Sequence, residues 1–100
     1  MLDTVIHQPV RLRTMSVLND LLPDEEVDFT YLKKVLGVTD GNLGSHLLRL
    51  EEAGYIRVRK TFVRRKPKTY VRVSGKGRDA YVAHVSALRK IIESGNNRGG

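Results

Sequence analysis

Apolar positions in the first part of the chain recur at three- and four-residue intervals, a spacing that predicts helices. We expect one helix over Pro9–Leu22, with the proline in its first turn. A shorter helix is expected before it, over Leu2–His7, begun by Asp3 or Thr4. Pro23–Glu26 interrupts the pattern, because proline cannot continue a helix. The N-terminal region is therefore expected to be helical up to that proline.

A second helical region follows the proline. We expect a very short strand over Val27–Phe29 and then a helix over Tyr31–Leu36, capped by Asp28 or Thr30. Gly37 stands where a residue in the left-handed conformation closes such a helix. The glycine predicts a tight turn into whatever element comes next.

The element after this turn is expected to be a helix over Asp40–Ala53, with Thr39 as its N-cap and Gly54 just beyond its end. At about 100° per residue, its apolar and polar side chains separate onto opposite sides. The apolar side carries Leu43, Leu47 and Leu50, and the polar side carries Gly41, Asn42, Ser45, Arg49 and Glu52, with His46 at its flank.

The second half of the chain changes to the alternating pattern of strands. We expect a strand over Tyr55–Val63, a hairpin loop over Arg64–Lys68 and a returning strand over Thr69–Val73. Ser74 can cap a last helix running from about Lys76 to Ile92. Residues 1–93 are thus expected to form a single domain, with residues 94–100 as a flexible C-terminal tail.

This order of elements predicts an α+β fold that is mostly helical. A hairpin that follows the second helix of a helix-turn-helix is the winged helix-turn-helix arrangement, with a two-stranded β-hairpin as the wing. We call the expected Asp40–Ala53 helix the recognition helix, because in this arrangement it is the helix that enters the major groove of DNA.

The net charge of +7 becomes informative once it is located. Seven of the 18 basic residues lie between Arg57 and Lys68, a segment without any acidic residue, and the remaining 11 balance the 11 acidic residues. The excess charge is therefore concentrated in the hairpin, as expected for a protein that binds a polyanion.

Several kinds of chemistry are not indicated by the sequence. There is no cysteine, and His7, His46 and His84 do not have metal-ligand spacing, so we expect no metal, no cofactor and no enzymatic activity. No apolar run is long enough to cross a bilayer, and the first residues lack the pattern of a secretory leader. We expect a cytoplasmic protein that does not contact the membrane.

The polar side of the recognition helix carries groups that can bind DNA. Asn42 can hydrogen-bond adenine through two atoms, Ser45 can bond several bases, and Arg49 can reach guanine or a phosphate. Thr39 and the free N–H groups of the first turn can hold a phosphate oxygen. Two residues remain open: Asp40 either repels phosphate or favours the helix N-terminus, and Leu48 either contacts a thymine methyl group or packs beneath the wing.

The expected hairpin loop holds four cations, which repel one another unless an anionic partner is present. Arginine at such a tip can enter the minor groove, while Lys60 and also Arg59 can reach the flanking phosphates. The alternative is that the charges only keep an exposed strand edge from pairing with other chains. The cations of the loop are Arg64, Arg65, Lys66 and Lys68.

The chain resembles compact winged-helix regulators of the MarR/ArsR-like superfamily, in the run from Phe29 to Ile56, the basic wing, Thr69-Tyr70 and Val73–Arg78. The resemblance spans about Val10 to Tyr81. It implies a DNA-binding transcriptional regulator that acts as a homodimer on pseudo-palindromic duplex sites, with the terminal helices forming the dimer interface. Carried onto this chain, it assigns DNA contacts to Thr39, Asp40, Gly41, Asn42, Ser45, His46, Arg49, Lys60, Arg64, Arg65, Lys66 and Lys68.

The chain departs from that family in two ways. It is shorter than full MarR-type proteins, and it lacks the cysteine motif with which many ArsR-type proteins sense metals. Neither a small-molecule effector nor a sensed metal is therefore implied.

The last predicted helix has a wide apolar face, which independently favours a dimer. The alternative is that the two terminal helices simply cover one core. Tyr81, Val85, Leu88 and Ile92 form one stripe of this face, and Ala80, Ala83, Ala87 and Ile91 extend it.

Three functions are compatible with these features. The first is a sequence-specific regulator that binds double-stranded DNA. The second is an architectural nucleic-acid-binding protein without sequence preference, and the third is a winged-helix module that binds another protein. The basic hairpin favours the first two.

Overall fold

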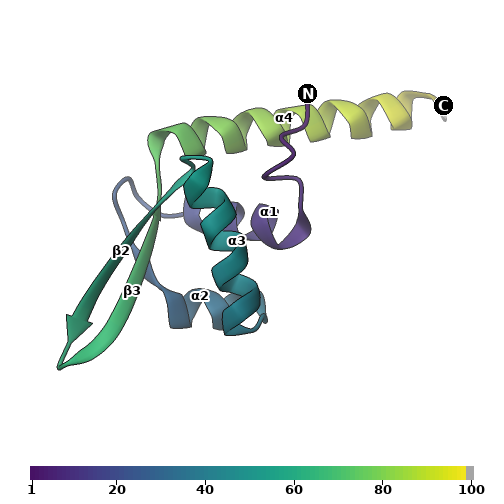
Figure 1. The fold of residues 1–100 in the computed structure, drawn as a ribbon. Coiled ribbons are helices and arrows are strands. Elements are labelled where there is room, and N and C mark those ends of the chain that lie inside the picture. Colours follow the sequence, from purple (N-terminus) through teal and green to yellow (C-terminus); the bar gives the residue numbers. More distant parts are fainter. Residues whose placement is uncertain (99–100) are drawn as a thin grey trace.

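The computed structural model describes residues 1–98 and has the predicted winged helix-turn-helix arrangement (Figure 1). Helices α1, α2 and α3 pack together, the β2–β3 hairpin extends to one side of them, and the long helix α4 lies across the opposite end of the molecule. We call the β2–β3 hairpin the wing. The elements in order are α1 (Pro9–Asn19), β1 (Val27–Asp28), α2 (Phe29–Leu36), α3 (Asp40–Glu52), β2 (Ile56–Val63), β3 (Lys66–Val73) and α4 (Gly75–Arg98).

The helix-turn-helix is held by the predicted caps. The Oδ1 atom of Asp28 accepts the N–H of Tyr31 at 2.7 Å, and Gly37 closes α2 with a φ of 67°. The hydroxyl of Thr39 accepts the N–H of Asn42 at 3.1 Å and begins α3. Of the two residues offered as the cap of α2, Asp28 is confirmed, and it begins the helix two residues earlier than expected.

The core lies between the three helices and the inner face of the sheet. All three leucines predicted for the apolar side of α3 are buried in it. Its buried apolar residues are Ile6, Met15, Leu18, Leu32, Leu36, Leu43, Leu47, Leu50, Ile56, Val71 and Val73. This packing turns the polar side of α3 outward.

The three strands form an antiparallel sheet in the order β1-β3-β2. The turn of the wing is shorter than expected, because only Arg64 and Arg65 lie outside the strands and both have positive φ values, 52° and 66°. Two central residues with positive φ define a type I′ turn, whose twist matches that of a hairpin. The expected five-residue loop is therefore wrong, and Lys66, Pro67 and Lys68 belong to β3.

Pro67 is tolerated in a strand for a geometric reason. Next to a two-residue turn, Val63 and Lys66 form the hydrogen-bonded pair, so the neighbouring pair Phe62–Pro67 needs no N–H from proline. β1 pairs only with Tyr70 and Val71, so no strand lies on the other side of Pro67.

The N-terminal segment is a single turn and not the expected helix over Leu2–His7. Asp3 begins this turn as predicted, since its Oδ1 atom accepts the N–H groups of Val5 and Ile6. The turn cannot continue into α1, because Gln8 is extended and caps the new helix with its own side chain.

Polar contacts hold this turn to the ends of the domain. The N–H of Asp3 donates to Nδ1 of buried His84 in α4 at 3.0 Å, and the Tyr55 hydroxyl donates to the Asp3 carboxylate. That carboxylate raises the pKa of Tyr55 to about 12. The N-terminal turn and α4 are therefore adjacent, as Figure 1 also shows.

Two helix ends also differ from the prediction. α1 stops at Asn19 and not near Leu22, because a residue before proline disfavours the helical conformation and Pro23 follows. α4 continues to Arg98, past the expected end at Ile92. The flexibility of the tail 94–100 remains a prediction, since the backbone of residues 94–98 continues α4 and residues 99–100 lie outside the described part.

α4 begins against the start of β2. The Ser74 hydroxyl caps α4, as predicted, by accepting the N–H of Gly77 at 2.9 Å, and it donates to the Gly54 carbonyl at 2.6 Å. A Cβ atom on Gly77 would lie 2.0 Å from the carbonyl oxygen of Tyr55, so only glycine fits this contact.

No helix among residues 1–98 is long and apolar enough to span a membrane.

Candidate nucleic-acid interface

The outward side of α3 is open and polar. The side chains predicted to meet DNA from this side are exposed, and apart from the cap at Thr39 and the pair of Asp40 with Lys33 none of them is used to hold the fold. Leu43 and Leu47 pack inward between them and fix which side faces outward. The exposed set comprises Thr39, Asp40, Gly41, Asn42, Ser45 and Arg49.

Asp40 does not act as an isolated negative charge at this surface. Its Oδ1 atom lies 2.7 Å from Nζ of Lys33 in α2, and it also lies in the first turn of α3, where the helix dipole favours an acid. The pair leaves the start of α3 with little net charge. It therefore resolves the apparent conflict between Asp40 and a phosphate backbone.

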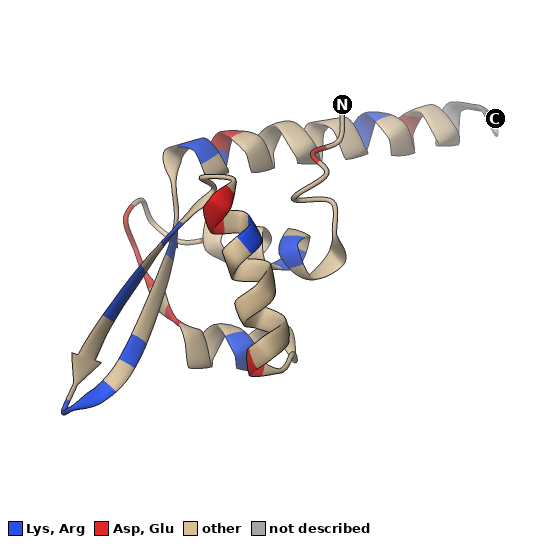
Figure 2. Cartoon of the chain, in the orientation of Figure 1, with Lys and Arg blue, Asp and Glu red and all other residues tan. Residues whose placement is uncertain are grey.

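The cations of the wing lie along both of its strands and at its turn (Figure 2). Strand pairing places Arg57, Arg59, Lys68 and Arg72 on one face and Lys60 on the other, with Ile56 and Val58. Red acidic segments run beside the wing in Figure 2, along the connection from α1 to β1. The face with most of the cations is therefore the one nearest this acidic connection, and we call it the outer face.

Three acids between α1 and α2, two in the connection and one in β1, pair with three cations of the outer face. Glu26 binds Arg59 through both carboxylate oxygens, at 2.8 and 3.1 Å. Asp24 lies 3.0 Å from Arg72, and Asp28 lies 3.4 Å from Lys68. The hydrogen bond from Arg59 lowers the pKa of Glu26, while the N–H of Tyr31 is the main cause of the lowered pKa of Asp28.

These pairs change two of the expected DNA contacts. Arg59 binds Glu26 and lies 4.5 Å from the centre of the Tyr70 ring, so it must leave this pair before it can reach a phosphate. Lys68 lies within β3 and beside Asp28, not at the tip of the hairpin. Charge counting along the sequence could not detect this, because the acids lie about 35 to 50 residues before their partners.

The tip of the wing keeps its charge. Arg64, Arg65 and Lys66 are exposed, and none of them takes part in an ion pair within residues 1–98. Arginine rarely occupies the left-handed positions of a type I′ turn, which favour asparagine and glycine and cost other residues about 1 kcal/mol or more each. Two arginines at these positions are therefore a feature that folding alone does not explain.

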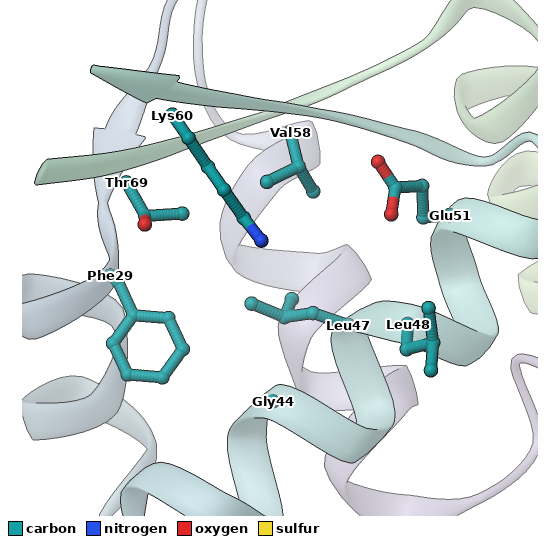
Figure 3. Close-up of a pocket in the computed structure, with 8 residues that line it drawn as sticks. All are labelled: Phe29, Gly44, Leu47, Leu48, Glu51, Val58, Lys60 and Thr69. Carbon is teal, nitrogen blue, oxygen red and sulfur yellow. The ribbon is translucent and has the colours of Figure 1, made fainter.

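A pocket of about 370 Å³ lies between α3 and the wing (Figure 3). The ammonium group of Lys60 points into it from β2, while Leu47 and Leu48 of α3 form the side opposite Lys60 and Phe29 lies at one end. Leu48 is 56 % exposed, so it faces the wing without being covered by it. Lys60 thus lies between the tip and α3, where it can reach a duplex that contacts both.

His46 has a different environment from the other predicted contacts. It is half-buried, and its Nδ1 atom lies 3.1 Å from Nη1 of Arg11 in α1. Burial is the main cause of its lowered pKa, and the charge of Arg11 adds to it. The imidazole is therefore neutral near pH 7.

Arg11 is a candidate that the sequence analysis missed. It is a single arginine in a helix expected to pack on the core, and only the contact across 35 residues places it beside His46. Its Nε group also donates to the carbonyl of Val5. No local pattern could have identified it.

Among the described residues, no cluster of three or more histidines and acids could hold a metal ion.

Comparisons with known proteins agree with this geometry. Residues 10–92 match the model of a family described as a winged helix DNA-binding domain. An uncharacterized protein of Methanocaldococcus jannaschii is 36 % identical over 92 residues, which cover 89 % of this chain and 97 % of that protein. The predicted resemblance to winged-helix regulators is thereby supported at the level of the whole domain.

Solved structures point the same way. A transcriptional regulator homologue from Pyrococcus horikoshii OT3 is 32 % identical, with a TM-score of 0.80 over 90 % of this chain and 86 % of that one. A PadR-like transcription factor from Bacteroides fragilis, 20 % identical, shares the fold with a TM-score of 0.71 over 95 % and 98 % of the two chains. The family model, which spans most of the chain, marks a DNA-binding domain. The chain is therefore a member of the winged-helix DNA-binding domain family.

Proposed function

We propose that the protein is a homodimeric transcriptional regulator that recognises a specific sequence in double-stranded DNA. In this proposal the exposed side of α3 enters the major groove, where Asn42 and Ser45 meet base edges. The wing tip reaches the adjacent minor groove or backbone, and Lys60 contacts a phosphate between the two. Asp40 faces Lys33 and makes no direct contact of its own.

The observation that carries the proposal is the strained pair of arginines at the tip. Arg64 and Arg65 occupy positions with positive φ that other residues fill more easily, and they have no acidic partner in the described structure. A narrow minor groove has a strongly negative potential and attracts inserted arginine. Binding there would offset both the backbone strain and the repulsion between the two charges.

The dimer is supported by the apolar surface of α4. Ile91 and Ile92 are 56 % and 61 % exposed beside half-buried Leu88, and the helix continues past the body of the domain. Exposed apolar surface of this kind typically marks an interface. The N-terminal turn lies beside α4, so a second copy that packs on α4 would also meet the first residues of the chain.

A selection of duplexes from a random pool, followed by sedimentation of the complex, tests this function. We expect an enriched two-fold symmetric motif and two protein chains per duplex. Asn42→Ala should reduce the preference for that motif by roughly tenfold, because one two-atom contact to a base contributes about 1–3 kcal/mol of discrimination. Tight binding without any enriched motif would instead identify an architectural protein, and no binding to duplex DNA at low salt would remove the proposal.

A further inference from the structure

A second basic cluster lies on the flank of α3 that faces away from the wing. Figure 2 shows a blue segment of α1 beside a blue segment of α3 on this flank. The cluster consists of Arg11 from α1 with His46 and Arg49 from α3, and the last two are three residues apart and hence neighbours on the helix surface. The bond from Nε of Arg11 to the Val5 carbonyl gives that arginine a structural role, but it does not explain why Arg49 lies beside it.

The two guanidinium groups of this cluster are close enough to repel each other. Burial lowers the pKa of Arg11, and the nearby charge of Arg49 lowers it further. Neither arginine belongs to any of the ion pairs found among residues 1–98. Elsewhere in the protein, three of the four cations that define the outer face of the wing pair with acids, whereas both arginines next to the recognition helix are unmatched.

The hydrogen bonds of Arg11 also determine what the cluster can offer to a ligand. Arginine can only donate, so the Nδ1 atom of His46 must be the acceptor in its contact with Nη1 of Arg11. The proton of the neutral imidazole is then on Nε2, which is not among the buried atoms without a partner in the described structure. The ring therefore presents an N–H donor at the surface, beside the free N–H groups of both arginines.

We propose that Arg11, His46 and Arg49 form a binding site for one backbone phosphate of the DNA duplex. A phosphodiester brings a full negative charge and two oxygens that accept hydrogen bonds, which matches converging donors that have no acid among them. The site rests on the proposed DNA-binding function and deepens it. It assigns Arg49 to the backbone, where the sequence allowed either guanine or phosphate.

With this site, the protein contacts the DNA backbone on both flanks of α3. The wing and Lys60 hold the duplex on one side of the helix, and the Arg11 site holds it on the other. Phosphate contacts of this kind fix the orientation of a recognition helix without reading the sequence. Arg11 thus serves as a positioning residue as well, because it holds the His46 ring in its donor form.

The test compares Arg11→Met with Arg13→Met. Both substitutions remove one cation from α1 and keep an unbranched stem, but Arg13 donates to the carbonyl of Leu36 and makes no hydrogen bond to His46 or Arg49 within residues 1–98. Duplex binding is measured over a range of salt concentrations. We expect Arg11→Met to weaken binding to all duplexes by roughly tenfold and to reduce the salt slope by about 0.9, whereas Arg13→Met changes neither.

A duplex series with a neutral methylphosphonate at one position at a time identifies the phosphate itself. Neutralising one particular phosphate should weaken duplex binding by the wild-type protein. The same change should not weaken binding by Arg11→Met any further. Arg49→Met, at an exposed position that contributes no packing to the core, should be insensitive to the same position and guards against a folding defect in Arg11→Met.

The outcomes separate this site from the function on which it rests. If the wild-type protein binds duplex DNA and both Arg11→Met and Arg49→Met keep its salt slope, the phosphate site is wrong and the regulator remains. If the wild-type protein does not bind duplex DNA at low salt, the function itself fails. A nitrogen-15 NMR spectrum that places the His46 proton on Nδ1 would also contradict the arrangement.

Discussion

The outer face of the wing and its tip come from the same basic segment, but they differ in what their charges do. On the outer face, Arg59, Lys68 and Arg72 are matched by three acids between α1 and α2. At the tip, Arg64 and Arg65 form no ion pair with any part of the chain that the structure describes, and they adopt a conformation that arginine rarely takes. The number of cations in a segment therefore says less about DNA binding than the number left unpaired in the fold.

The difference also separates stability from function within one hairpin. The acids hold the outer face to the connection and help to fix the direction in which the wing extends. The tip gains nothing from its arginines in the free protein, since the favoured residues of a type I′ turn are asparagine and glycine. Natural proteins typically retain such a cost where a functional site requires it.

Replacing the two arginines at the tip should have the largest effect on DNA binding. The double variant Arg64→Asn with Arg65→Gly supplies the residues that the turn prefers, so we expect the unfolding free energy to rise by about 1–2 kcal/mol. Binding to every duplex should fall by roughly 100-fold at low salt, because two cations are lost. Thermal unfolding and a salt titration of DNA binding measure the two effects.

A variant that lost both stability and affinity would contradict this separation. The tip would then be part of the structural framework, and its arginines would contribute to folding in a way that the contacts do not indicate. A matched control is Arg64→Lys with Arg65→Lys, which keeps the charges and should retain most of the affinity.

Releasing a cation of the outer face from its acid should strengthen DNA binding, by less than the tip variant weakens it. Glu26→Gln removes the acid that holds Arg59, so a cation becomes available beside the duplex. We expect binding to random duplexes to strengthen by roughly threefold and the salt slope to increase. Unchanged binding would indicate that the outer face lies too far from DNA for its charge to matter.

Removing the cation of the same pair should have a similarly small effect of the opposite sign on DNA binding. Arg59→Met takes away no charge that is free in the wild-type protein but leaves the Glu26 carboxylate unpaired, so duplex affinity should fall by no more than about threefold. A loss as large as that of the tip variant would show that Arg59 leaves Glu26 in the complex.

Two of the acids that pair with the outer face, Glu26 and Asp28, predict a small dependence of stability on pH. The pKa values of Glu26 and Asp28 are lowered in the fold, so their stabilisation is complete above the ordinary carboxylate range and is lost as the pH falls through the lowered values. Asp28→Asn keeps a side chain that can cap α2 but cannot titrate. Its unfolding free energy should therefore fall less than that of the wild-type protein between about pH 5 and pH 2, as measured by urea unfolding.

Local signals explain which parts of the fold could be predicted. Thr39, Gly37 and Ser74 act within three residues of themselves, and the leucines of α3 need only the helical repeat, so the helix-turn-helix and the outward side of α3 follow from the sequence. The turn of the wing was missed because Arg-Arg gives no signal for a type I′ turn and Pro67 indicates a loop.

The candidate site could be predicted only in part, because much of it depends on contacts between distant segments. The exposed positions of α3 and the tip follow from local pattern. The pairing of Glu26 with Arg59 and the contact of Arg11 with His46 join residues more than 30 positions apart, and both change which cations are free.

The end of α4 was placed too early because Ser94 and Gly95 suggest fraying, yet the helix continues through them.

Gly77 has a consequence for the length of the DNA site. Its missing side chain lets the first turn of α4 rest on the backbone of Tyr55, at the point where the long helix leaves the DNA-binding body. In the proposed dimer, the direction of α4 from this point determines how far apart the two copies of α3 stand, and half-sites one turn of the duplex apart require a separation of about 34–36 Å. The distance between half-sites is thereby governed by a residue that touches neither DNA nor the second copy. Substitutions at this position are expected to select differently spaced operators while leaving each half-site sequence unchanged.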